Sequence, residues 1–168
     1  MRNPTSGKTV KTLRRFNIKQ TYYFITIVTH KRERLLLRDI ELFWSCWKDV
    51  KISSWVILPD HFHLMILIDK ISISQVIHNF KITYSRRFRD KYRKGRVWQN
   101  RFWDHIIRDQ VDMNRHIDYI HYNPVKHKLT DDPFSYDKSS LNKYYADGYY
   151  QSDWGVKEKL QFEGDYGE

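Results

Sequence analysis

The alternation of apolar and polar positions along the chain predicts four β-strands and three helices. The predicted strands are rich in aromatic and β-branched residues, whereas the first two predicted helices carry apolar residues three or four positions apart. We expect strands at residues 22–29, 55–58, 62–68 and 97–108, and helices at residues 40–50, 73–91 and 112–123. Pro59 and Asp60 separate the second and third strands by a short turn, and we therefore expect these two strands to form a hairpin.

Capping residues and one proline set the expected ends of the helices. Asp39 can cap the first helix and Asp112 the last, because a short carboxylate side chain accepts the free N–H groups of a first helical turn. Pro124 disfavours a helical conformation at the residue before it. The last helix is therefore expected to end close to Asn123.

The resulting order is β-α-β-β-α-β-α, and its first six elements match the split β-α-β, ferredoxin-like pattern. We predict an α+β fold in which a four-stranded antiparallel sheet carries helices on one face, followed by one further helix and an irregular tail. The expected regions are a basic N-terminal arm (residues 1–19), a folded body (residues 20–130) and an acidic, aromatic tail (residues 131–168).

The charge of the chain is divided unevenly. The 168 residues carry a formal net charge of +10, with 26 Lys/Arg and 11 Asp/Glu up to Thr130, but 4 Lys/Arg and 9 Asp/Glu beyond it. A basic body with interleaved aromatics favours a nucleic-acid partner; a solvated helix face plus a loose basic arm is the alternative. The tail can pack on the body or lie across a basic groove and compete with DNA, and we favour packing.

Other features limit the setting in which the protein works. The longest aliphatic run, residues 64–68, is far shorter than the roughly 20 residues of a membrane-spanning helix. The first residues lack the apolar core of a secretory signal, and Cys46 alone cannot form an intramolecular disulfide. We therefore expect a cytoplasmic protein with no membrane partner.

Two histidines in the third predicted strand have the spacing of metal ligands. Alternate residues on a strand share one face, so His61 and His63 can converge on one ion while Phe62 points to the core. Two ordinary half-buried imidazoles are the alternative. Tyr119 and Asn123 lie four residues apart, which places them on one face of the last helix if the helix extends that far.

Three segments together resemble the REP-associated tyrosine transposases, single-tyrosine relatives of the transposases of small insertion sequences within the histidine-hydrophobic-histidine nucleases. The segments are LPDHFHL at residues 58–64, WQNRFWDH at residues 98–105 and DYIHYNPVKH at residues 118–127. Two serines at residues 139–140 and an Asp-Trp-Gly triplet at residues 153–155 resemble the C-terminal pattern of the same family. The likeness covers about residues 22–155.

The resemblance implies a metal-dependent endonuclease and strand transferase that acts on single-stranded DNA bearing hairpins, such as REP sequences, through a 5′-phosphotyrosine. Tyr119 matches the nucleophile, and His61 and His63 match ligands of Mg²⁺ or Mn²⁺. Asn123 stands where a polar residue completes the metal site, although Pro124 would turn it away. A monomer, bound to the nucleoid through DNA, is favoured over a dimer. The alternative is a non-catalytic or domesticated DNA-binding regulator on the same fold.

Basic and aromatic side chains supply the expected DNA contacts. The candidates for the DNA backbone are Arg14, Arg15, Arg86, Arg87, Arg93, Arg96, Arg101, Arg108 and Lys126. Lys126 and His116 are also candidates for orienting phosphate or handling protons, with His121 a weaker third. Trp98, Phe102, Trp103 and Tyr122 can stack on bases, although we expect most of them in the core.

At two positions the chain departs from the family pattern. Asp60 replaces a common asparagine and brings a negative charge beside the metal site, which would either tighten cation binding or repel phosphate. Lys128 stands where many relatives have glycine.

Overall fold

The computed structural model describes residues 20–69 and 71–168. Its strands are β1 (Thr21–Val28), β2 (Lys51–Ile57), β3 (His61–Ile68) and β4 (Trp103–Ile106), and its α-helices are α1 (Ile40–Ser45), α2 (Ile73–Lys91), α3 (Gln110–Lys126) and α4 (Leu141–Ala146). None of the helices in this part of the chain has the length and apolarity of a membrane span. The predicted basic arm, with Arg14 and Arg15, lies outside the described residues.

The four strands form one antiparallel sheet in the order β2-β3-β1-β4, which is the ferredoxin-like arrangement. β2 and β3 form the expected hairpin, and its turn is closed by a hydrogen bond from Leu58 N to His61 O at 2.9 Å. In the β1–β3 register, Val28 lies opposite His61 and Thr26 opposite His63. The predicted fold class is confirmed.

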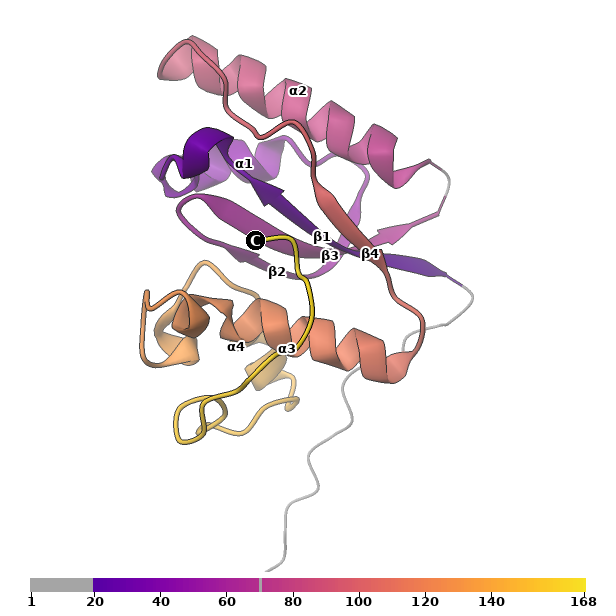
Figure 1. The fold of residues 1–168 in the computed structure, drawn as a ribbon, viewed down its shortest axis with the longest axis vertical. Coiled ribbons are helices and arrows are strands. Elements are labelled where there is room, and N and C mark those ends of the chain that lie inside the picture. The colour runs from indigo at the N-terminus through magenta and orange to yellow at the C-terminus, as the bar shows by residue number, and fades with distance from the viewer. Residues whose placement is uncertain (1–19, 70) are drawn as a thin grey trace, which may run out of the picture.

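Helices cover both faces of the sheet (Figure 1). α1 and α2 lie on one face, where Phe80 of α2 packs against Phe62 of β3 with ring centroids 5.6 Å apart. α3 lies on the other face and buries Ile117 against the sheet. Successive side chains of a strand point to opposite faces. His61 and His63 therefore point toward α3, while Phe62 enters the layer of α1 and α2.

The first helix is shorter than its apolar spacing predicts. Asp39 caps α1 as expected, accepting a backbone N–H at 2.9 Å, but the helix ends at Ser45 and not near Val50. Trp47 lies beyond the helix end and still reaches the core, where its ring stacks on Phe80 at a centroid distance of 4.0 Å. Residue 47 is therefore apolar because it packs in the core, although it lies beyond the end of α1.

The fourth strand is also shorter than predicted. Of residues 97–108, only Trp103–Ile106 pair along β1, and Trp98 makes one isolated bridge at the end of β1. The carbonyl groups of residues 99–101 instead face the ammonium group of Lys81 on α2, with distances of 2.9–3.5 Å. Contact with this cation keeps the backbone between Trp98 and β4 out of the sheet.

The last long helix begins earlier and ends later than predicted. Asp109, not Asp112, is its N-cap and accepts the Asp112 N–H at 2.8 Å. Pro124 lies inside α3, which continues through Asn123 to Lys126. The expectation that Pro124 ends the helix and turns Asn123 away is therefore wrong, and Asn123 is fully buried.

A Schellman motif ends α3 shortly after its proline. Lys128 N donates to Val125 O and Leu129 N donates to Pro124 O, both at 2.9 Å, so the last turn is closed by bonds that need no N–H from the proline. Lys128 occupies the left-handed position of this motif, with φ 55°. Glycine is the usual residue there because it has no Cβ to strain.

We expect Lys128→Gly to stabilise the protein by about 1 kcal/mol, because relief of left-handed strain, about 1–2 kcal/mol, exceeds the entropy that glycine adds to the unfolded chain. The urea midpoint and the melting temperature should both rise. Lys128→Ala keeps the Cβ and should leave them unchanged; an equal gain in both variants would show that the lysine side chain, and not the backbone, is destabilising.

Much of the predicted tail packs on the body. Ile57 N donates to Lys138 O and Ser140 N to Trp55 O, both at 2.9 Å, so residues 138–140 run beside β2. The side chains of Leu141, Tyr144 and Tyr150 are buried against α3 and the sheet. Packing, the alternative that we favoured, is thus confirmed for this part of the tail, while the domain boundary at residue 130 stays a prediction.

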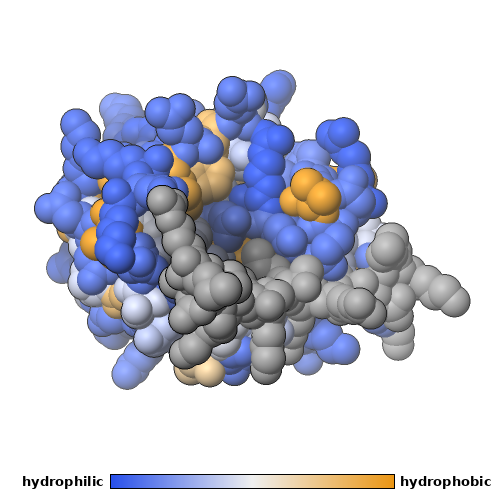
Figure 2. Space-filling view, turned by 90° about the horizontal axis from the view of Figure 1, so that it is seen from below, coloured by the Kyte–Doolittle hydropathy of each residue, from blue (hydrophilic) through white to orange (hydrophobic). Residues whose placement is uncertain are grey.

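In the view from below, the described residues that can be seen are predominantly hydrophilic, with only scattered apolar side chains (Figure 2). Such a face agrees with the charged composition of the chain, in which Asp, Glu, Lys and Arg make up 30% of the residues.

Candidate active site

His61 and His63 of β3 meet on the side of the sheet that faces α3. Both imidazoles are buried, and their ring centroids lie 5.1 Å apart. Phe62 between them points into the opposite core. The expectation that the strand presents the two histidines together is confirmed.

Hydrogen bonds fix the orientation of His61. Its Nδ1 lies 2.7 Å from Asp60 Oδ1, and Arg32 pairs with the other carboxylate oxygen at 3.1 Å. Burial acts to lower the pKa of His61, but the carboxylates of Asp60 and Glu168 outweigh it and raise the pKa. Nδ1 donates to Asp60, while Nε2 is buried, makes no hydrogen bond to any described residue and lies 3.7 Å from Glu168 Oε1. Asp60 therefore influences the site by fixing the orientation of the His61 imidazole.

His63 is held in the same way. Its Nδ1 lies 2.7 Å from Thr26 Oγ1, and that hydroxyl donates its only proton to Tyr166 O at 2.5 Å. His63 Nδ1 must therefore be the donor, which leaves the lone pair on Nε2. Burial lowers the pKa of His63 to about 4, so the imidazole is neutral at neutral pH. Nε2 lies 2.9 Å from Glu168 Oε1.

One face of α3 brings three more groups to the histidines. Tyr119 is buried, and its hydroxyl accepts a hydrogen bond from Lys126 Nζ at 2.8 Å. Asn123, one turn later, donates from Nδ2 to Glu168 Oε1 at 2.7 Å, and its Oδ1 is buried without a partner among the described residues. His127 follows after another turn, with its ring centroid 4.7 Å from that of His61.

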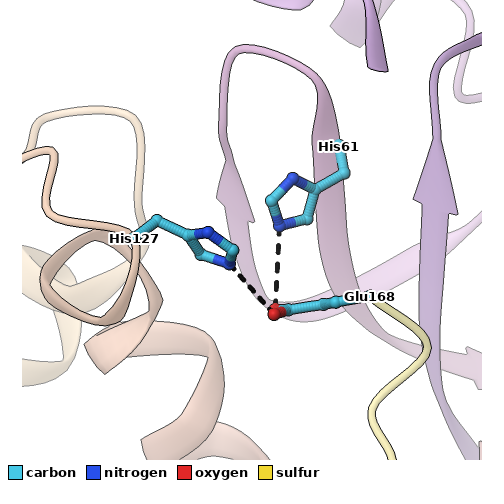
Figure 3. Close-up of side chains that lie close together, drawn as sticks. All are labelled: His61, His127 and Glu168. Carbon is cyan, nitrogen blue, oxygen red and sulfur yellow. Dashed lines mark hydrogen bonds and ion pairs between the residues drawn. The ribbon is translucent and has the colours of Figure 1, made fainter. Parts of the chain in front are cut away.

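The carboxylate of Glu168 lies at the centre of this group, and its side chain is only 13% exposed. It accepts short hydrogen bonds from the Tyr119 hydroxyl and from Lys126, and its Oε2 lies 3.0 Å from His127 Nε2 (Figure 3). Burial would raise the pKa of Glu168, but the imidazoles of His127, His61 and His63 hold it far below its ordinary value.

Residues 162–168, here called the returning segment, carry Glu168 into the site. The ring of Tyr166 stacks on that of Tyr119, with centroids 3.7 Å apart and an interplanar angle of 9°. Gly167 packs on Trp103 so closely that a Cβ there would lie 2.3 Å from Trp103 Cβ. The tail therefore packs on the body and also enters the group that the sequence predicts to be catalytic.

The structure brings together Tyr119, His61, His63, Asn123 and Lys126, all of which the sequence singles out. Two residues of the site were not predicted, His127 and Glu168. His127 lies eight residues after Tyr119, on the same helix face, and a helix continued past Pro124 would have revealed it. No periodicity in the tail signals Glu168.

The chemistry of the group fits a divalent cation. His61 Nε2 and Asn123 Oδ1 are buried without a hydrogen-bond partner among the described residues, and imidazole nitrogen and amide oxygen are atoms that bind metal ions. Ligand atoms of His61, His127 and Glu168 lie within 4.8 Å of one another. Imidazole nitrogen with carboxylate and amide oxygen suits Mn²⁺ and also admits Mg²⁺.

The other candidate histidines lie outside this group. His116 is buried, its Nδ1 donates to Asp112 O at 2.8 Å, and its ring stacks on that of His105. His121 projects to the far side of α3, where it lies 2.8 Å from both Tyr150 Oη and Ser140 Oγ. His121 therefore helps to anchor the tail.

The structure does not bring the candidate DNA-binding arginines to the histidines. Arg86 and Arg87 lie on α2, across the sheet from α3 (Figure 1). Arg93 and Arg96 follow α2, where Arg93 pairs with Glu33 and Arg96 donates to Trp98 O. Arg101 and Arg108 are exposed on either side of β4. Their contacts with DNA stay predictions.

The aromatic candidates divide between core and surface. Trp98 and Tyr122 are buried, with 5% and 4% exposure, whereas Phe102 and Trp103 are partly exposed. Stacking of a base on any of these four rings stays a prediction.

Known proteins are similar to this chain in sequence and in fold. Residues 17–123 match the model of the family described as transposase IS200 like. A provisionally named REP-associated tyrosine transposase of Haemophilus influenzae is 34% identical over 171 residues, which cover 90% of this chain and 97% of that protein. A REP-associated tyrosine transposase of Escherichia coli K12 is 30% identical over 155 residues, covering 84% and 88%. The solved structure of a REP-associated tyrosine transposase bound to a REP hairpin aligns with 93% of this chain and 96% of that chain, at a TM-score of 0.76 and 27% identity.

Proposed function

Because this chain belongs to the IS200-like transposase family, in the branch of the REP-associated tyrosine transposases, we propose that it cleaves and rejoins single-stranded hairpin DNA through a covalent bond to Tyr119. One observation carries the proposal: the Tyr119 hydroxyl lies within the same group as His61, His63 and Asn123, with ring centroids of His63 and Tyr119 5.3 Å apart. A nucleophile beside a cation site is the arrangement that phosphodiester cleavage requires.

The cation would be held by His61, His63 and Asn123. When bound, Mg²⁺ or Mn²⁺ supplies Lewis-acid polarisation of a phosphate oxygen. Asp60 and Thr26 hold the two imidazoles in the tautomer that offers Nε2 to the ion.

Tyr119 needs help to become a nucleophile. Burial raises the pKa of its phenol well above the ordinary value of 10, and the neighbouring Glu168 carboxylate raises it further. Lys126 already donates to the phenol oxygen, and its positive charge stabilises the phenolate as the proton leaves. Displacement of Glu168 by a DNA phosphate would remove the opposing negative charge. We thus assign Lys126 to the activation of Tyr119.

The proposed reaction balances without an outside energy source. The phenolate oxygen of Tyr119 bonds to the phosphorus while the bond from phosphorus to the 3′ oxygen breaks, and that oxygen takes a proton to become a 3′-hydroxyl. A second 3′-hydroxyl attacking the 5′-phosphotyrosine reverses these steps and rejoins strands. Cleavage and transfer are then one reaction run in two directions.

Hairpin DNA is proposed as substrate because the solved relative is bound to a REP hairpin. We also propose that the protein acts as a monomer, since Tyr119 reaches His61 and His63 within a single chain. The DNA backbone would be bound at phosphates other than the reacting one. The residues proposed for these contacts are Arg101, Arg108 and the arginines at and after the end of α2.

The test is incubation of the full chain with labelled single-stranded hairpin DNA and Mg²⁺ or Mn²⁺. We expect a covalent protein–DNA adduct on a denaturing gel, absent when a chelator is added. Hairpin binding without an adduct under any of these conditions would favour the alternative, a non-catalytic DNA-binding regulator.

A further inference from the structure

We propose that Glu168 and His127 are additional ligands of the cation held by His61 and His63, so that the returning segment completes the metal site. The proposal rests on the metal-dependent function above and extends it. It assigns a ligand role to two residues that lie outside the histidine pair of β3, one at the end of α3 and one 41 positions later in the chain.

Hydrogen bonds at Nδ1 direct the Nε2 atoms of both histidines toward Glu168. Asp60 Oδ1 accepts from His61 Nδ1, and Thr26 Oγ1 accepts from His63 Nδ1. Nε2 lies 3.7 Å from Glu168 Oε1 in His61 and 2.9 Å from it in His63. Two imidazole nitrogens gathered on one carboxylate oxygen in a buried site are a donor set that suits a divalent cation.

His127 adds a third imidazole to the same carboxylate. Figure 3 shows the His61 and His127 rings pointing at Glu168 from two different elements, β3 and the end of α3. His127 Nε2 lies 3.0 Å from Glu168 Oε2, and its ring lies beside that of His61. Ligands of one first-row ion are separated by about 3–4 Å when each is about 2.1 Å from the ion, so small side-chain rotations bring these atoms into one shell.

The returning segment is built to hold Glu168 in place. Tyr166 is buried by its stacking on Tyr119, and its hydroxyl accepts a hydrogen bond from Arg115 Nε at 2.8 Å. Gly167 has φ 78° and contacts Trp103 at a distance that excludes any side chain. A carboxylate on such a fixed segment is positioned as a ligand.

The experiment measures Mn²⁺ affinity of the full chain without DNA, from the electron paramagnetic resonance of free Mn²⁺. We expect Glu168→Gln and His127→Ala each to weaken binding by about tenfold or more, since loss of even a supporting residue costs a metal site about 10–100-fold. Gly167→Ala, which keeps every ligand but displaces Glu168, should also weaken it. Glu163→Gln on the same segment and His78→Ala on α2 are matched controls with exposed side chains and should bind as the unaltered chain does.

Two results would overturn the proposal. Unchanged Mn²⁺ affinity in both Glu168→Gln and His127→Ala, together with a loss in His61→Ala, would restrict the ligands to the histidine pair and Asn123. Tighter binding in Glu168→Gln would make the carboxylate a competitor of the metal site. Either result is compatible with a covalent adduct formed by the unaltered chain. If the proposed function is wrong, the unaltered chain itself forms no adduct.

Discussion

Tyr119→Phe should abolish the covalent adduct with single-stranded hairpin DNA, a loss of at least about a thousandfold, because removal of a nucleophile leaves only the residual rate of binding and electrostatics. The substitution keeps the ring that stacks on Tyr166 and removes only the hydroxyl between Lys126 and Glu168. The adduct is quantified on a denaturing gel with Mn²⁺ in excess. Hairpin affinity, measured separately, should stay within a few-fold of the unaltered chain.

Tyr166→Phe is the matched control, since that ring lies against Tyr119 and its hydroxyl contacts Arg115 instead. It should form the adduct. If Tyr119→Phe still forms the adduct and Tyr166→Phe does not, the nucleophile is Tyr166 and the assignment of Tyr119 is wrong.

The sequence predicts the histidine pair because a strand has a fixed period. Any strand over residues 61–68 places His61 and His63 on one face and Phe62 on the other, whatever the surroundings. Asp39 likewise caps α1 through a bond between near neighbours. Features of this kind are local, and the sequence contains all the information they need.

Predictions fail where distant contacts decide. Trp47 has the spacing expected of a helix, but it lies beyond the helix end and its position is set by stacking on Phe80, 33 positions later. The strand-like composition of residues 97–108 is overridden where Lys81 attracts three backbone carbonyls. Neither contact follows from a period of 2 or 3.6 residues, so the ends of these elements could not be placed from the sequence.

The site itself was predicted in part for the same reason. A general rule about Pro124 shortened the expected helix, so His127 was not placed on the same helix face as Tyr119. Glu168 lies 41 positions after His127, in the returning segment, which forms no helix or strand. Only tertiary packing of Tyr166 and Gly167 determines where its carboxylate lies.

The two parts of the tail should respond to truncation in opposite ways. A chain ending after residue 130 loses the buried side chains of Leu141, Tyr144 and Tyr150 and the backbone bonds of residues 138–140 to β2. At about 1.5–3 kcal/mol for each buried side chain, the loss is comparable to the whole stability of a typical domain. We expect insoluble or unfolded protein, recognised by the absence of a cooperative melt.

A chain ending after residue 161 should instead stay folded and bind single-stranded DNA about tenfold or more tightly in the presence of a chelator. The returning segment carries three carboxylates, and that of Glu168 occupies the donors of Lys126, His127 and Asn123 that a phosphate would use. Anion competition of this kind weakens with salt, so the gain should shrink as ionic strength rises. Equal DNA affinity of the shortened and full chains at low salt would mean that the segment leaves the site freely and does not compete for it.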